Sequence, residues 1–234
     1  MKLGIMQPYF LPHLGYFDLI YNSDKWIVFD SVQYIRKGWM NRNRILHPGK
    51  KWQYISVPIQ KAHRETAIYN IKIKTDAKWQ DKIFAQLTHY KKKAPFYSEV
   101  TALLEECFSY EGDSLSGLNK HSLQVVCDYL GISFSPKVFS EMGLEFGKVS
   151  GPGDWALRIS EALGADVYVN PPGGVDIFDP VAFERRGIEF VFRDITPLEY
   201  DCSPYTFVSR LSIVDVLMWN KKEAVLAYVE ASKM

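Results

Sequence analysis

Short apolar runs that alternate with helical periodicity set the predicted architecture of this chain. The run KLGIM at 2–6 stops at Gln7 and Pro8, which predicts a buried first strand, because proline cannot donate the next ladder hydrogen bond. A loop and a short helix that ends near Asn22 are expected to follow. Further strands are predicted at 26–30, 52–58, 69–75, 166–170 and 188–192. Strands that alternate with helices favour a mainly parallel sheet.

A helical block interrupts this alternation between about 77 and 131. Its apolar residues follow the helical period in three segments, and Gly131 stands where a glycine would end the last helix. More helices are predicted at 153–165, around 179–186 and from about 212, with Ser212 as an N-cap. We therefore expect one α/β domain over 1–234, with a mainly parallel, Rossmann-like sheet and the helical block as an excursion or lid.

The overall charge excludes some classes of protein. Lys and Arg number 28 and Asp and Glu 27, so the formal charge of +1 does not indicate a nucleic-acid coat protein or a polybasic membrane binder. The three cysteines and five histidines are scattered, which predicts neither a disulfide framework nor a tightly bound metal. No signal peptide and no apolar run long enough for a membrane span is found, so we expect a cytoplasmic protein without membrane insertion.

The distribution of charge is more informative than its total. Between Ser31 and Arg64 there are eight Lys or Arg residues and no Asp or Glu, which indicates an anionic partner. Within this stretch, GWMNRNRI places Trp39, Asn41 and Asn43 beside two arginines, Arg42 and Arg44. Stacking, amide and guanidinium groups suited to a nucleotide thus occur together. An equally weighted alternative is a solvated basic surface that is neutralised by acids of the helical block, namely Glu99, Glu105, Glu106, Glu111 and Asp113.

Two further segments carry candidate chemistry. The loop from Gln7 to Tyr16 leads into a helix whose first N–H groups can receive an anion, and it contains His13, a candidate for phosphate contact or proton transfer. Asp30 follows a strand at the edge where open α/β sheets place ligands, and it is the second candidate catalytic residue. The segment NPPGGVD adds Gly173, Gly174 and Asp176 as candidate ligand contacts, although a plain tight turn explains its glycines as well.

Two resemblances extend this interpretation. His13-Leu14-Gly15-Tyr16 resembles the H-x-G-H signature of the adenylyltransferase superfamily, with Tyr16 in place of the second histidine. Over nearly the whole length, IMQPYFLPHLGYFDLI, the spaced D-x-V-Q-Y-x-x-x-x-W-x-N-R-N-R-I, NPPGG-x-D and LSIVDVLMWN resemble the WbqC-like protein family. The residues that match the family pattern are Gln7, Pro8, Pro12, Gly15, Tyr16, Gln33, Trp39, Asn41, Arg42, Gly173 and Gly174.

The family resemblance implies a function in the synthesis of bacterial O-antigen and other surface polysaccharides (lipopolysaccharide). Members are proposed to attach glycine or a related acyl group to an amino sugar, and the adenylyltransferase resemblance implies ATP with Mg²⁺ and an acyl adenylate. A nucleotide or nucleotide-linked sugar is then the expected small-molecule partner, and an aminoacyl-tRNA donor is the one nucleic acid considered. A non-catalytic nucleotide-binding accessory protein and a nucleotidylyltransferase remain alternatives. We expect Gln7 to Tyr16, Asp30, Arg42 and the Gly173-Gly174 turn to meet at the carboxyl edge of one parallel sheet.

Overall fold

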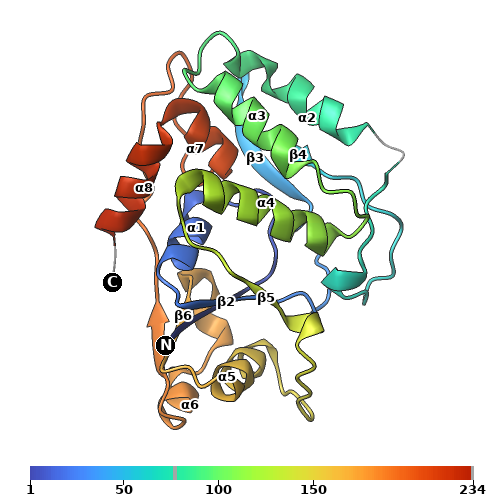
Figure 1. Cartoon of the computed structure of the whole chain (residues 1–234), viewed down its shortest axis with the longest axis vertical. Coiled ribbons are helices and arrows are strands. Elements are labelled where there is room, and N and C mark those ends of the chain that lie inside the picture. Colours follow the sequence, from blue (N-terminus) through green and yellow to red (C-terminus); the bar gives the residue numbers. More distant parts are fainter. Residues whose placement is uncertain (76–77, 233–234) are drawn as a thin grey trace.

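A five-stranded parallel sheet forms the centre of the molecule, with helices on both faces (Figure 1). The computed structural model describes residues 1–75 and 78–232, so Ala77, at the start of the predicted helical block, lies outside the described residues. The strands of the sheet are β1 (Lys2–Met6), β2 (Lys25–Val28), β5 (Lys137–Val138), β6 (Val167–Asn170) and β7 (Glu189–Phe192). Their order is β5-β2-β1-β6-β7, which is the order of a doubly wound Rossmann sheet. The predicted fold class is confirmed.

The helices follow the predicted periodicity closely. They are α1 (Leu14–Tyr21), α2 (Trp79–Leu87), α3 (Tyr97–Cys107), α4 (Leu115–Leu130), α5 (Pro152–Ala162), α6 (Pro180–Glu184), α7 (Ile213–Trp219) and α8 (Lys222–Ala231). Gly131 ends α4 with a φ of 75°, a left-handed conformation that glycine adopts without a Cβ clash. The Ser212 hydroxyl accepts the N–H of Val214 and caps α7. Both caps were predicted from the sequence.

The region between β2 and α2 differs from the sequence prediction. The strand predicted at 52–58 exists as β4 (Lys50–Ser56), but it pairs with β3 (Arg42–His47) in an antiparallel hairpin that the apolar pattern did not predict. The strand predicted at 69–75 is wrong. Its first residues form a 3-10 turn, Ile68–Asn70, and the alternating burial that follows arises from single bridges rather than from a ladder.

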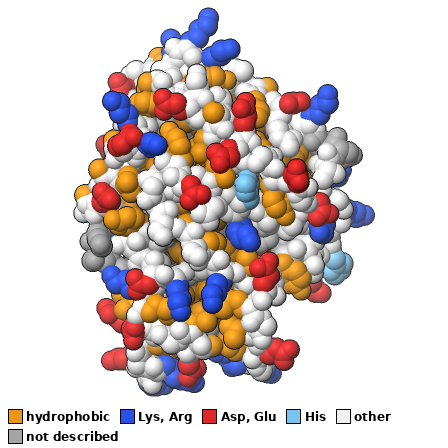
Figure 2. Space-filling model, in the orientation of Figure 1, with side chains coloured by type: hydrophobic (Ala, Val, Ile, Leu, Met, Phe, Trp, Pro, Cys, Tyr) orange, Lys and Arg blue, Asp and Glu red, His pale blue; other side chains and the backbone are white. Residues whose placement is uncertain are grey.

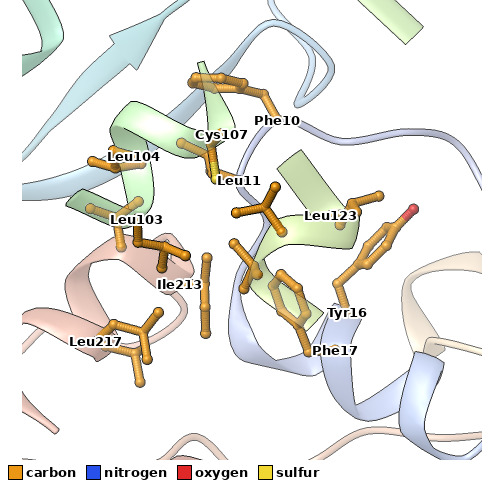
Figure 3. Packing of buried hydrophobic residues seen from close by; sticks show 14 of the residues in the cluster. Phe10, Leu11, Tyr16, Phe17, Leu103, Leu104, Cys107, Leu123, Ile213 and Leu217 are labelled. Carbon is orange, nitrogen blue, oxygen red and sulfur yellow. The ribbon is translucent and has the colours of Figure 1, made fainter. Parts of the chain in front are cut away.

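The parallel sheet separates two hydrophobic cores. On one face, Leu3, Ile5 and Ile27 pack with α5 and α6, which lie below the sheet in Figure 1. On the other face, a larger core joins α1, the β3–β4 hairpin, the helices α2 to α4 and the C-terminal helices. Figure 3 shows the centre of this core, where side chains of the loop after β1 and of α1 meet those of α3, α4 and α7.

No helix within the described ranges is long and apolar enough to cross a lipid bilayer.

Candidate functional site

The loop between β1 and α1 is fixed by three buried polar side chains from distant parts of the chain. The amide nitrogen of Asn43, on β3, donates to the carbonyl oxygens of two loop residues at 3.0 and 2.9 Å. The amide nitrogen of Asn119, on α4, donates to the carbonyl of Pro8 at 2.8 Å, and the hydroxyl of Ser212 donates to that of Leu11 at 2.7 Å. A buried backbone carbonyl needs a partner, so these side chains set the path of the loop.

His13 closes this loop and caps α1. Its Nδ1 accepts the backbone N–H of Gly15 at 3.1 Å, so the hydrogen of the neutral ring lies on Nε2. Burial lowers the pKa of His13 to about 4, and the charges of Arg210 and Arg44 lower it as well, while Asp194 opposes them. At neutral pH, His13 is therefore an uncharged hydrogen-bond donor rather than a cation.

Arg42 and Arg44 lie on one face of β3, two residues apart, and both stack on aromatic rings. The guanidinium carbon of Arg42 is 4.0 Å from the ring centre of Tyr54. That of Arg44 is 5.3 Å from the ring centres of both Trp39 and Trp52. Stacking fixes the planes of the guanidinium groups and leaves their edges available for hydrogen bonds, as recognition of a phosphate requires.

The positive charges of the 31–64 stretch are not neutralised by direct ion pairs. The ion pairs formed by residues 1–75 and 78–232 include none of its eight Lys and Arg side chains. Arg42 donates instead to the carbonyl of Lys37, and Arg44 donates weakly to that of Arg210, 3.5 Å away. The Nε atoms of Arg42 and Arg44 are buried and have no partner in the structure. The acids of the helical block therefore do not pair with these arginines.

A small cavity lies beside His13, between the start of α1 and the segments that follow β7. It measures about 30 Å³, and its polar lining includes Thr196, Tyr200 and Arg210. Arg210 pairs with Asp194 at 2.6 Å. A space of this size holds a water-sized group, so it can accommodate one end of a ligand but not a whole nucleotide.

Asp30, the second candidate catalytic residue, is engaged by one neighbour. Its two carboxylate oxygens accept the backbone N–H and the hydroxyl of Ser140, at 3.1 and 2.8 Å. The carboxyl group is buried, and burial raises its pKa while the bonds from Ser140 oppose that rise. This geometry ties the end of β2 to the residues after β5 and gives Asp30 a structural role.

Other predicted contact residues are also held by the protein itself. The amide of Asn41 donates to Val57 at 2.9 Å and accepts the hydroxyl of Tyr34 at 2.8 Å. Tyr16 is buried, and its hydroxyl donates to the carbonyl of Gln7 at 2.8 Å. Gln33 is exposed, and its amide donates to a carbonyl of the neighbouring segment. These side chains hold the site together, whereas Arg42, Arg44 and His13 retain groups that face no protein partner.

The Gly173-Gly174 turn follows β6 and packs on itself. A Cβ at Gly174 would lie 2.6 Å from the ring of Phe178, so glycine is needed there for close packing. Gly173 faces open space, and Asp176 is exposed. Within the described part of the chain, no hydrogen bond, ion pair or ring contact joins this turn to Arg42 or Arg44.

The structure thus brings together only part of the predicted set. Backbone hydrogen bonds join the loop after β1 to Trp39 and join Asp30 to Tyr69, so the carboxyl edge of the sheet adjoins the basic stretch. The sequence indicated Asn43 as an amide beside the arginines but not as a support of the loop after β1, and it did not indicate Asn119. Asn43 alternates with Arg42 and Arg44 at the period of a strand, which places its amide on the face opposite to the two guanidinium groups. Nothing in the sequence identified Asn119, which lies in the middle of a helix. No side chains of three His, Cys, Asp or Glu residues group as metal ligands in the ranges that the structure covers.

Comparison with known proteins assigns the chain to a family. The chain is 28% identical over 194 residues to the uncharacterized protein Rv1507c of Mycobacterium tuberculosis (strain ATCC 25618 / H37Rv). The aligned region covers 82% of each of the two chains. No solved structure matches. The model of the WbqC-like protein family matches residues 7–227, which include the loop after β1, both arginines of β3 and the helix that begins after Ser212, and the chain belongs to this family.

Proposed function

We propose that this protein is a transferase of bacterial surface-polysaccharide synthesis that joins glycine or a related acyl group to the amine of a nucleotide-linked amino sugar. In this reaction, the amine nitrogen attacks an activated acyl carbon, an amide bond forms, and the activating group leaves. Membership of the WbqC-like family supports the class of substrate. The sheet order supports binding of a nucleotide, since doubly wound sheets bind nucleotides beyond the carboxyl ends of their strands.

The observation that carries the proposal is the pair formed by Arg42 and Arg44. Both guanidinium groups are stacked, neither pairs with a carboxylate among the described residues, and each has a buried Nε–H without a partner. Leaving a buried donor unsatisfied costs about 1–3 kcal/mol, and more for a charged group, unless a ligand provides the acceptor. The two phosphates of a nucleotide-linked sugar supply two anionic acceptors, one for each guanidinium group.

His13 fits the same proposal as a hydrogen-bond donor. Its Nε2–H stabilises an oxygen that gains negative charge as the acyl carbon is attacked, and it does so without a change of protonation. The capped Nδ1 cannot take up a proton while it accepts the N–H of Gly15. His13 is thus proposed to stabilise charge rather than to act as a general base.

The test is binding of nucleotide-linked amino sugars to Arg44→Ala and Arg42→Ala variants. Each variant should bind about 10- to 150-fold more weakly, because a hydrogen bond to a charged group contributes about 1.5–3 kcal/mol, and lysine should restore only part of the loss. Isothermal titration measures the affinities, and thermal unfolding verifies the fold. Lys92→Ala, at an exposed site outside the 31–64 stretch, is the matched control. Wild-type affinity in both arginine variants would remove the basis of the proposal.

A second candidate function is binding without turnover. It is favoured by one observation, namely that both carboxylate oxygens of Asp30 and the Nδ1 of His13 are already engaged. Mass spectrometry of the sugar after incubation with glycine, ATP and Mg²⁺ separates the two functions, because only the transferase adds the mass of a glycyl group. ATP–pyrophosphate exchange in the same mixture detects an acyl adenylate, and exchange without glycine indicates a nucleotidylyltransferase.

A further inference from the structure

An exposed basic patch continues outward from the stacked arginines. Two irregular segments, 33–37 and 61–64, lie side by side. The guanidinium of Arg36 donates to the carbonyl of Ala62 at 2.9 Å, and the amide of Gln33 donates to that of Arg64 at 2.8 Å. The exposed cations of this basic patch are Arg36, Lys37, Lys61 and Arg64. Glu65, directly after it, is the nearest acidic residue in the chain and forms none of the ion pairs found in the described ranges.

The basic patch adjoins the candidate site. Arg36 and Arg42 both lie close enough to Tyr34 for their charges to oppose the rise of its pKa that burial causes. Arg42 reaches the carbonyl of Lys37 with its guanidinium group. An anionic chain that crosses the basic patch would therefore end at Arg42, where the proposed phosphate site begins.

Exposed apolar rings and side chains accompany these cations. Ile35 is 56% exposed, Trp39 38% and Tyr69 43%. By contrast, the face that carries α3 and α4 has Asp and Glu side chains interspersed with Lys and Arg (Figure 2). Residues 31–64, which include the basic patch, carry eight Lys or Arg and no Asp or Glu, so positive charge is in local excess there. Cations together with exposed rings suit a flexible strand with one phosphate and one base per unit, because the cations neutralise phosphates and the rings stack on bases.

We propose that the basic patch binds the single-stranded end of an RNA that carries the acyl group as an ester on its terminal ribose. This inference rests on the proposed function, for which it names the acyl donor. In the transfer, the amine nitrogen of the sugar forms an amide bond with the acyl carbon, and the ester bond to the ribose oxygen breaks. The proton lost by the nitrogen is taken up by the ribose oxygen, so the step needs no ATP and no oxidant.

The binding test uses a short fluorescent single-stranded RNA with a free 3′ end and measures anisotropy over a series of salt concentrations. Lys61→Ala combined with Arg64→Ala removes two exposed cations, so affinity should fall about tenfold or more and the salt slope should decrease by about 1.4. Lys91→Ala combined with Lys92→Ala removes the same charge from an exposed site at the end of the α2 region and should change neither quantity. Equal effects of the two double variants would overturn the proposal, because binding of the RNA would then depend on the total charge of the protein and not on the basic patch.

The rings are tested separately. Tyr69→Ala should weaken binding of RNA about 5- to 150-fold, Tyr69→Phe should not, and neither should alter binding of inorganic polyphosphate, which has no bases. Vesicles that contain an anionic phospholipid form a further arm. If they displace the RNA and respond to Lys61→Ala with Arg64→Ala in the same way, the patch is a membrane surface and the proposal fails.

The transfer itself distinguishes this inference from the proposed function. Glycyl-RNA and a nucleotide-linked amino sugar, mixed with the protein without ATP, should yield the glycyl amide by mass spectrometry, and the Lys61→Ala/Arg64→Ala variant should yield it more slowly. Product formed only from free glycine with ATP overturns the RNA donor and leaves the proposed function intact. Absence of product from both donors overturns both.

Discussion

At the scale of single residues, His13 illustrates how a neighbour decides what a side chain can do. From the sequence, a histidine beside a helix start is a candidate for proton transfer. In the structure its Nδ1 is occupied by the N–H of Gly15, and two arginines oppose its protonation. The sequence located the residue but did not predict its protonation, because Arg210 lies almost two hundred positions away in the chain.

This environment of His13 predicts a pH-dependent stability. The folded pKa of about 4 lies below the ordinary value of 6.5, so between these values the unfolded chain binds more protons and the free energy of unfolding falls as the pH is lowered from 6.5 to 4. His13→Asn keeps a capping side chain but cannot titrate. Between pH 6.5 and pH 4, the free energy of unfolding of the variant should fall by about 1–3 kcal/mol less than that of the wild type, as measured by urea unfolding at several pH values. If wild type and variant lose stability in parallel, burial of neutral His13 is not the cause.

Asp30 and Asn41 show the limit of residue-level prediction. Asp30 was selected because it ends a predicted strand, and Asn41 because its amide stands beside an aromatic ring and arginines in the sequence. Ser140, which engages Asp30, stands 110 positions later in the sequence. Spacing along the chain carries no information about such a distant partner. The sequence therefore identifies a polar residue more readily than the hydrogen bond that this residue makes.

At the scale of elements, the β3–β4 hairpin was half predicted. The apolar alternation of β4 was visible, whereas the first residues of β3, Arg42 to Arg44, are all polar, so the apolar pattern did not mark them as a strand. The opposite error was made at 69–75, where burial alternates without a ladder partner. Period-two patterns therefore predict which faces are buried more securely than they predict strand pairing.

The elements around the hairpin meet at Asp215 of α7. Its carboxylate is fully buried and accepts the N–H of Leu46 at 3.2 Å, the hydroxyl of Tyr200 at 2.6 Å and the hydroxyl of Tyr90. This carboxylate joins α7 to β3, to the end of the α2 region and to the segment before α7.

Removal of this carboxylate should be strongly destabilising. Asp215→Ala leaves the hydroxyls of Tyr90 and Tyr200 without their acceptor, while the N–H of Leu46 keeps the hydroxyl oxygen of Tyr90 at 3.0 Å, so the free energy of unfolding should fall by about 3–5 kcal/mol. Tyr200→Phe removes one of the three bonds and should cost about 1 kcal/mol. Urea denaturation measures both. Similar losses for the two variants would mean that the carboxylate stabilises through Tyr200 alone.

At the scale of the whole molecule, the alternation of strands and helices predicted the parallel sheet but not the order of its strands. The order of the strands depends on which side of β1 each later strand is added to, and the packing of helices on the two faces of the sheet decides this. One buried ion pair links distant segments of the chain in this arrangement. Arg193, after β7, donates to both carboxylate oxygens of Asp18 on α1 at 2.6 and 2.7 Å and also contacts Ser232 after α8.

This ion pair should matter more when it is broken than when it is replaced. Arg193→Ala leaves the carboxylate of Asp18, which is 1% exposed, without its cation, and should lower the free energy of unfolding by about 3–5 kcal/mol. Asp18→Leu combined with Arg193→Met substitutes apolar side chains of similar size and should recover most of the loss. Thermal unfolding of the three proteins provides the comparison. A double variant no more stable than Arg193→Ala would show that the charges themselves are required.

The bond between Ser212 and Leu11 has a consequence for synthesis of the protein. The loop that carries His13 is made among the first residues to leave the ribosome, yet one of the side chains that fix its path is added 201 positions later. Even when the helices made earlier have folded, this loop cannot adopt its final path until translation has passed Ser212. A nascent chain that stops short of this serine would carry every arginine of the 31–64 stretch and still lack one of the bonds that shape the candidate site. The geometry of the candidate site is therefore completed only after Ser212 has been added.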